Sequence, residues 1–275
     1  MAEKPPLHPN EVRRILRQLA PLSDDRRIIL IGGQAVAFWA AFFRLAPPTV
    51  EPTLFTSSDI DFEGASQAAR KAADLLKGEV RIPEIDRHTP NTGLVIFVDS
   101  DGITREIDFL AEPLGLNAQD VRKTAIRLNV SRPGRLETPV WVMHPERCME
   151  SRVYNVVRLR QTGRIALDQL RRSVVCAQAF SRYLLDDKSG TRADRVRDVL
   201  RLNERIFRKC LTERPFRDVL FDHGVDPFEA VLLDDRLPEK FHEIRYPQMA
   251  QQLEDQRRRS RAQRARYAQR RSPRN

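Results

Sequence analysis

The first half of the chain alternates between strand-like and helix-like patterns of apolar residues. Apolar positions at helical spacing over residues 8–20 predict an opening helix. The apolar run at 26–33 predicts a buried strand that ends in Gly32 and Gly33, and residues 33–45 predict the helix that follows it. Because this second helix is apolar nearly all round, we expect it to lie inside the domain. The order is therefore strand, glycine turn, helix.

Strands with alternating polarity continue the pattern, and helices then take over. The segment 56–63 predicts a strand, residues 65–77 a helix, and further strands are expected at 79–82, 93–99, 103–112 and 138–144. From about residue 144 helical spacing dominates, at 145–161, 164–187 and 191–211. We therefore predict an α/β (α+β) fold: a mixed-sheet domain at 1–143, a helical domain at 144–238, and a basic, partly helical or disordered tail at 239–275.

The composition and charge of the chain indicate its cellular location and the class of its binding partners. None of its apolar stretches approaches the length of a membrane span, and the first residues lack the pattern of a signal peptide, so we expect a cytoplasmic protein without a membrane partner. The net charge of +10 is concentrated at the end: residues 251–275 hold nine arginines against Glu254 and Asp255. This balance favours a polyanionic partner for the tail, and a solvated end without a specific partner is the alternative.

The cysteines and histidines do not form a recognisable ligand set. Cys148, Cys176 and Cys210 are far apart and sit beside bulky apolar residues, as expected of small buried side chains rather than of a disulfide framework or zinc site. His88 and His144 have no ligand-like spacing, and each is expected to be a capping or surface residue. The candidate chemistry therefore depends on carboxylates and glycines.

Three aspartates form the first candidate site. Asp59 and Asp61 are two positions apart on one predicted strand, so their side chains project to the same face while Ile60 and Phe62 pack behind them. Asp108 lies on a later strand with the same alternation. Carboxylates gathered on neighbouring strands would form a divalent-cation site.

The glycine turn is the second candidate. A strand that ends in Gly32 and Gly33 and leads into a helix lets the backbone approach a phosphate, with helix amides facing it. The pair is part of neither a Walker loop nor a GxGxxG fingerprint. Taken alone it is better explained as a simple tight turn.

In combination, the strand, glycine pair, apolar helix, Asp-x-Asp and later aspartate resemble the nucleotidyltransferase superfamily with the DNA polymerase β-like fold. The resemblance covers about residues 27–164 and is nearest to the minimal branch that includes AbiEii-type and MenA-type toxins. It implies that Asp59, Asp61 and Asp108 hold two Mg²⁺ ions and carry catalysis, with Asp108 accepting the proton of the attacking hydroxyl.

The resemblance also implies a nucleoside triphosphate (NTP) as substrate, contacted by Gly32 and Gly33 and by the hydroxyl of Ser57 or Ser58. Arg152 stands where AbiEii-like chains have a phosphate-binding lysine. The chain departs from many relatives in having Phe55 and Thr56, and no basic residue, just before the Asp-x-Asp segment. Asp168 falls near a further acidic position of the family and is equally explained as a structural ion-pair partner.

The expected function is transfer of a nucleoside monophosphate from an NTP to an acceptor hydroxyl. RNA or tRNA is the expected acceptor, bound through the basic tail, and the resemblance implies a toxin role beside a cognate antitoxin protein. Two alternatives remain open: the same chemistry on a small molecule, and a non-catalytic module that binds RNA or a protein.

Overall fold

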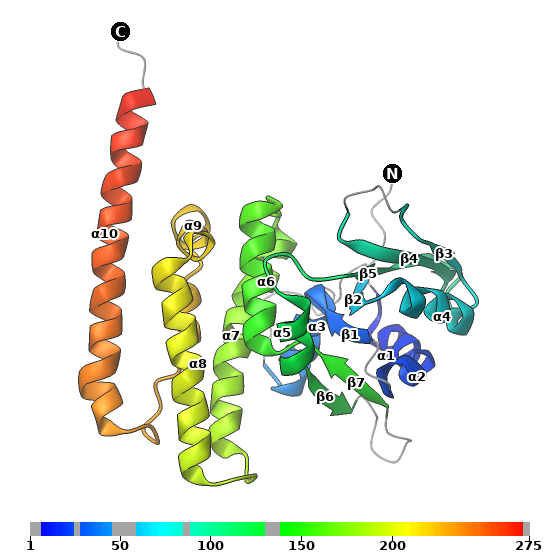
Figure 1. The fold of residues 1–275 in the computed structure, drawn as a ribbon, viewed down its shortest axis with the longest axis horizontal. Helices are drawn as coiled ribbons and strands as arrows, with labels where there is room; N and C mark the ends of the chain where they lie inside the picture. The colour runs from blue at the N-terminus through cyan, green and yellow to red at the C-terminus, as the bar shows by residue number, and fades with distance from the viewer. Residues whose placement is uncertain (1–6, 25–27, 46–58, 85–88, 130–137, 272–275) are drawn as a thin grey trace. The chain divides into compact units, whose positions relative to one another are not determined.

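The computed structural model describes residues 7–24, 28–45, 59–84, 89–129 and 138–271. Within these ranges the chain forms a seven-stranded mixed sheet accompanied by helices and followed by a further set of helices (Figure 1). The predicted α/β class with a mixed sheet is therefore confirmed.

The part of the chain that carries the sheet begins with two short helices and alternates strands and helices up to α7. Its helices are α1 (Pro9–Gln18), α2 (Ala20–Asp24), α3 (Gly32–Phe42), α4 (Ser66–Leu76), α5 (Ala118–Thr124), α6 (Pro145–Arg158) and α7 (Arg164–Asp186). Its strands are β1 (Ile28–Ile31), β2 (Ile60–Gly64), β3 (Glu79–Arg81), β4 (Asn91–Val98), β5 (Thr104–Leu110), β6 (Ile126–Asn129) and β7 (Pro139–Val142).

The sheet places the two aspartate-bearing strands side by side at its centre. The strand order is β3-β4-β5-β2-β1-β7-β6. β2 runs antiparallel to β1 and parallel to β5, in a register that pairs Asp61 with Asp108 and Phe62 with Phe109. Strands β3, β4 and β5 are antiparallel neighbours, as are β6 and β7, while β1 and β7 are parallel.

Apolar packing fixes this centre from both faces. All four residues of β1 are buried, and the rings of Phe62 and Phe109 stack with centroids 5.7 Å apart. On α3, Trp39 is buried and donates a hydrogen bond from Nε1 to the carbonyl oxygen of Met143 (2.8 Å). The C-terminal turn of α3 is nevertheless less enclosed than its all-round apolar pattern predicts, since Phe42 is 43% exposed.

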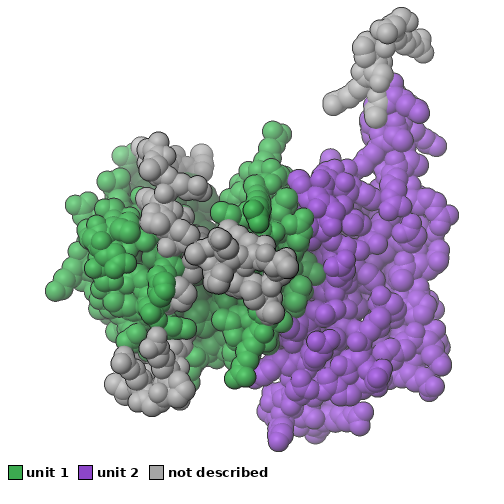
Figure 2. Space-filling model, turned by 180° about the vertical axis from the view of Figure 1, so that it is seen from behind, with its two compact units in different colours: residues 1–176 green, residues 177–275 purple. Residues whose placement is uncertain are grey.

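The chain divides into two compact units, at 1–176 and 177–275 (Figure 2). The boundary falls inside α7, whereas the change of pattern along the sequence comes at residue 144. Helix α6 belongs to the first unit, where it packs against α3. The three-part division at 144 and 239 stays a prediction.

The second unit consists of helices. After the last part of α7 they are α8 (Arg192–Thr212), α9 (Arg214–His223), the 3-10 turn η2 (Pro227–Ala230), the π-helical turn η3 (Phe241–Arg245) and the long α10 (Tyr246–Arg271). The start of α10 is anchored by buried Met249 and Leu253 and by the ring of Tyr246, which stacks on Phe228. The rest of α10 is polar, so its contacts are made by charged side chains.

Three short elements of the sheet unit were not predicted from the pattern. One is the five-residue α2, which follows the opening helix, and the other two are α5 and β6. Helix α5 has seven residues, and β6 has four, with Ile126 and Leu128 only half-buried. Both are too short for their periodicity to stand out from a loop. Their positions depend on partners elsewhere, since β6 pairs with β7 and Arg122 of α5 donates from Nε and Nη2 to Oε1 of Glu63 (3.0 and 2.8 Å).

The expectations for cysteines and one histidine are confirmed. Cys148, Cys176 and Cys210 are buried and free of disulfides, and burial raises the pKa of each thiol, that of Cys176 to about 12. His144 caps α6, where its Nδ1 accepts a hydrogen bond from the amide of Glu146 (3.2 Å). His88 lies outside the described residues.

Across the described ranges, no helix has both the length and the apolar character that a membrane crossing requires.

Candidate active site

The glycine pair joins β1 directly to α3 and brings the backbone against Asp61. Ile31 is extended, whereas Gly32 has a φ of +68° and is the first residue of the helix. A Cβ at Gly32 would lie 2.0 Å from Oδ2 of Asp61, closer than any contact a side chain tolerates. Glycine is therefore required here twice, by its backbone conformation and by the neighbouring carboxylate.

The second glycine lets another element approach. A Cβ at Gly33 would lie 2.5 Å from Nε2 of Gln169, a residue of α7. The start of α3 is thus in contact with a carboxylate on one side and with an amide on the other. A ligand phosphate at this turn would meet backbone amides and the positive end of the helix dipole.

Asp61 and Asp108 are neighbours because β2 and β5 are parallel and paired in register. Side chains at paired positions of adjacent strands project to the same face. Asn91, at the start of β4, donates a hydrogen bond from Nδ2 to Oδ1 of Asp108 (3.2 Å). One carboxylate oxygen of Asp108 is therefore oriented by an amide from the next strand.

The pKa of Asp61 is raised by its surroundings in the site. Burial raises its pKa from 3.8 to about 6, the charge of Arg152 opposes that rise, and the negative charges of Asp108 and Asp59 add to it. Three carboxylates and one guanidinium therefore lie within electrostatic reach of one another. Such a group has an excess of negative charge that a bound cation would relieve.

Arg152 reaches the site from α6 and is itself buried. Its Nη1 donates to Oε1 of Gln169 (3.0 Å), and with the Asn155 amide oriented to satisfy both its ends, Nη2 donates to Oδ1 of Asn155 (2.8 Å). Burial lowers the pKa of Arg152, and the charge of Asp61 opposes that shift. Its Nε is buried without a hydrogen-bond partner among the described residues, so the guanidinium is fixed in direction with a donor still to satisfy.

These residues surround a cavity of about 660 Å³ in the first unit. Asp59, Asp61, Arg152 and Gln169 contribute polar groups to its wall. The remaining lining residues are Ile31, Gly32, Gly33, Pro90, Asn91, Leu110, Glu112, Pro113, Leu114, Gly115, Ser151, Asn155, Leu159, Gln161, Gly163, Ile165 and Ala166. A cavity of this size and mixed lining suits a nucleotide-sized ligand.

The apolar part of this wall is exposed to an unusual degree. Leu114, Leu159 and Ile165 are 39%, 53% and 47% exposed and all line the cavity. They come from the loop after β5, from the end of α6 and from the start of α7. The cavity therefore combines a charged floor with an apolar rim.

The carboxylates fit a hard divalent cation by their chemistry, since oxygen ligands suit Mg²⁺. Among the described residues no three His, Cys, Asp or Glu side chains are arranged to hold a metal ion by themselves. Mg²⁺ in phosphoryl-transfer sites is commonly held by one or two carboxylates together with substrate phosphates and water. Asp59 and Asp61 on the cavity wall meet that smaller requirement.

The structure brings together most of the residues singled out from the sequence. Gly32, Gly33, Asp59, Asp61 and Arg152 line the cavity, and Asp108 is paired with Asp61. Ser57 and Ser58 lie outside the described residues.

Asp168 is committed elsewhere. Its carboxylate accepts from Nη1 of Arg171 (3.1 Å) and lies 3.9 Å from Nε of Arg164. The residue beside it, Gln169, enters the site instead. The sequence analysis missed Gln169 and Asn91, and the only available signal for Gln169 was its position next to Asp168.

Comparison with known proteins gives a likeness to solved structures and to nothing else. No family model matches the chain, and no curated protein matches it. A solved structure described as an antigenic nucleotidyltransferase-like protein from Paracoccidioides brasiliensis is similar with a TM-score of 0.41 and 15% sequence identity, over 62% of this chain and 78% of that one. At this level of likeness the chemistry has to be argued from the cavity itself.

Proposed function

We propose that this chain is a Mg²⁺-dependent nucleotidyltransferase that moves a nucleoside monophosphate from an NTP to an acceptor hydroxyl. The observation that carries the proposal is the state of Asp61. Burial and two neighbouring carboxylates destabilise its ionised form and raise its pKa. Asp61 lines a cavity whose wall also includes the Gly32–Gly33 turn and the buried Arg152. Strongly perturbed acids in a cavity with convergent polar groups are typical of active sites.

Each protein group has a role in this reaction. Asp59 and Asp61 would hold the cation, and Asp108 would complete the ligand set. The backbone at Gly32 and Gly33 faces the triphosphate, and Arg152 supplies donors to its oxygens. Bound Mg²⁺ would stabilise the charge that develops on the phosphate oxygens.

The bonds of the transfer balance without a further reactant. The acceptor oxygen forms a bond to the α-phosphorus, and the bond from that phosphorus to the bridging oxygen breaks, releasing pyrophosphate. The proton of the acceptor hydroxyl passes to Asp108, whose other oxygen is oriented by Asn91. This arrangement gives Asp108 a role distinct from that of Asp61.

We infer that the acceptor is RNA because residues 251–275 are rich in arginine, and the sequence resemblance favours tRNA as the class of RNA. Not all of these arginines are available to phosphates. Arg257 is held by a largely buried ion pair with Asp226, and Arg264 by a double pair with Asp218 and Asp222, whereas the pairs of Arg258 with Asp255 and of Arg261 with Glu254 are exposed. The salt dependence of binding should therefore be shallower than the log–log slope of about −6 that nine single-strand phosphate contacts would give.

A toxin role with a cognate antitoxin belongs to the same proposal and is supported by the sequence resemblance alone. Expression in a bacterial host should then arrest growth, and the Asp61→Asn variant should not. Relief of the arrest by the product of a neighbouring reading frame would identify the antitoxin. Growth unaffected by the active enzyme would remove the toxin role and leave the transfer chemistry standing.

The deciding experiment is transfer of label from each of four α-labelled NTPs, with Mg²⁺, onto total RNA and in parallel onto small hydroxyl compounds. We expect label on RNA with the wild-type chain and none with Asp59→Ala or Asp61→Asn. Label found only on small compounds would show that the acceptor is a small molecule and not RNA. No label on any acceptor from a folded chain would contradict the proposal and favour a non-catalytic binding module.

A further inference from the structure

The second unit contains a cleft of its own, between α9 and α10, with a volume of about 370 Å³. Helix α9 contributes Arg214, Arg217, Asp218 and Phe221, and α10 contributes Ser260, Gln263, Arg264 and Tyr267. Three guanidinium groups thus face one carboxylate, together with a hydroxyl, an amide and two aromatic rings. None of these residues takes part in the site of the first unit.

We propose that this cleft binds single-stranded RNA, with phosphates against Arg214 and Arg217 and a base against Tyr267. The choice of RNA rests on the proposed function, which makes RNA the acceptor. Binding is measurable without transfer, so the two proposals can fail separately.

The guanidinium groups of Arg214 and Arg217, which would bind phosphate, form few contacts within the protein. Arg217 forms no ion pair with any described residue, and its Nη1 donates to the carbonyl oxygen of Leu211 (3.1 Å), which leaves its other donors for a ligand. Arg214 contacts Asp218 (3.1 Å) with a side chain that is 82% exposed. An ion pair this exposed contributes little and is readily exchanged for a phosphate.

The cleft is held open by charged contacts rather than by an apolar core. Arg264 of α10 donates to both Asp218 and Asp222 of α9, and its guanidinium lies 4.9 Å from the centroid of the Phe221 ring. Arg261 lies over the same ring at 5.7 Å. These contacts fix the distance between the two helices, so the cleft exists before any ligand arrives.

The aromatic group favours a ligand that carries bases. Tyr267 lines the cleft and is 59% exposed, which leaves a ring available for stacking. Proteins recognise single-stranded RNA by stacking unpaired bases on aromatic rings beside a basic track. The segment of chain that supplies this ring, residues 256–271, contains eight arginines and no acidic residue.

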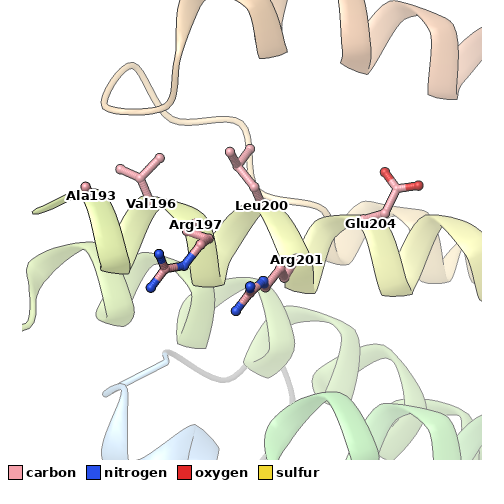
Figure 3. Close-up of a pocket in the computed structure, with 6 residues that line it drawn as sticks. All are labelled: Ala193, Val196, Arg197, Leu200, Arg201 and Glu204. Atoms are coloured by element: carbon pink, nitrogen blue, oxygen red, sulfur yellow. The ribbon is translucent and has the colours of Figure 1, made fainter.

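A second hollow of this unit, along α8, has a different character and provides a control. It is lined by Ala193, Val196, Arg197, Leu200, Arg201 and Glu204. Figure 3 shows Val196 and Leu200 directed to one side of the helix and Arg197 and Arg201 directed to the other. Arg201 is an exposed helical arginine of the same unit that makes a long pair with Asp198 (3.7 Å), and no aromatic residue lines the hollow beside it.

The test is fluorescence anisotropy of a labelled, unstructured RNA oligonucleotide with the full chain, at several salt concentrations and without NTP. We expect Arg217→Gln to weaken binding several-fold and to make the salt slope shallower by about 0.7, as expected for one lost phosphate contact. Tyr267→Ala should weaken binding by about 5- to 100-fold with an unchanged slope, and Tyr267→Phe should restore it, because stacking needs the ring and not the hydroxyl. Arg201→Gln should bind within twofold of the wild type.

Several results would contradict RNA binding in this cleft. One is wild-type affinity for RNA in both Arg217→Gln and Tyr267→Ala. Another is a loss of affinity in Arg201→Gln that equals the loss in the cleft variants. A flexible polyanion without bases that competes as well as RNA would remove the stacking argument. Asp61→Asn serves as the reference for the other proposal: it should bind RNA like the wild type and fail to transfer. If the wild type transfers nucleotide and the cleft variants bind RNA with wild-type affinity, the proposed RNA site in the cleft is wrong and the proposed transfer activity stands.

Discussion

Asp61 and Asp99 are two acids of the same sheet whose surroundings shift their pKa values in opposite directions. Asp99 is buried at the end of β4 and accepts hydrogen bonds from Nε of Arg105 (2.7 Å) and from the amides of Ile103 (2.8 Å) and Asp101 (2.9 Å). Burial disfavours its charge, but these hydrogen bonds and the charge of Arg105 together hold the pKa of Asp99 below its usual value.

At Asp61 the balance is reversed. Burial and the charges of Asp108 and Asp59 raise its pKa to about 6, and Arg152 only partly offsets them. The fold therefore satisfies one aspartate completely and leaves the other with excess negative charge beside a cavity. A buried carboxylate with its hydrogen bonds and counter-charge in place is a structural element, whereas a carboxylate with excess negative charge in a cavity is expected where a cation or substrate binds.

The largest expected difference is in activity. Asp61→Asn keeps the shape of the side chain and removes its charge, so transfer should fall by about 10³-fold or more, because several kcal/mol of metal-assisted stabilisation are lost. Measured single-turnover transfer, with thermal unfolding as the control for folding, tests this. A variant that transfers at more than a tenth of the wild-type rate would show that Asp61 is no functional residue.

The opposite result is expected at the satisfied aspartate. Asp99→Asn retains an oxygen for the two amides but leaves the buried Arg105 without its counter-charge, and should lower the free energy of unfolding by about 3–5 kcal/mol. Urea denaturation measures the loss. Asp99→Asn combined with Arg105→Met should recover much of it. A loss below about 1 kcal/mol would mean that the pair is no more than a surface contact.

The two acids should also give stability opposite dependences on pH. The pKa of Asp61 is raised in the fold, so the native metal-free protein holds a proton that the unfolded chain has lost, and stability should fall as pH rises from about 4 to about 6, by about 1.4 kcal/mol for each unit. Asp99, whose pKa is lowered, contributes stability that is lost only as pH falls below the usual aspartate range.

The pH dependence can be tested by unfolding at fixed temperature across this range. Asp61→Asn should abolish the fall between pH 4 and 6, and Mg²⁺ should oppose it in the wild type, since a cation favours the ionised carboxylate. An unchanged profile in Asp61→Asn would assign the titration to another group.

The smallest expected effect is on stability, when the glycines near these two acids, Gly32 and Gly102, are each replaced by alanine. Gly32 and Gly102 have φ values of +68° and +78°, but only Gly32 has an atom within 4 Å of an added Cβ. Gly102→Ala should cost about 1–2 kcal/mol from its backbone alone, with normal transfer. Gly32→Ala should add the displacement of Asp61 and impair transfer. The added cost should shrink when Asp61 is alanine, and an unchanged cost would place the strain elsewhere.

Much of the fold was predictable because its signals are local. The apolar run of β1, the alternation in β2, β4 and β5 and the helical spacing of α7 and α8 each depend on a period of two or 3.6 residues within one segment. The elements missed in the sheet unit, α2, α5 and β6, are short, and α5 and β6 are defined by partners rather than by their own pattern; α9 of the second unit was missed as well. The same limit applies to the division into units, which falls inside a continuous helix.

The sequence by itself determined that a glycine pair joins strand to helix and that Asp59 and Asp61 lie two positions apart at the start of β2, where both line the cavity, because these features follow from neighbouring residues. Only the tertiary structure decided that β2 and β5 pair in parallel with Asp61 beside Asp108 and that Gln169 rather than Asp168 enters the cavity. It also decided which tail arginines are taken up by ion pairs. These contacts join segments far apart in the chain, and no local periodicity specifies them.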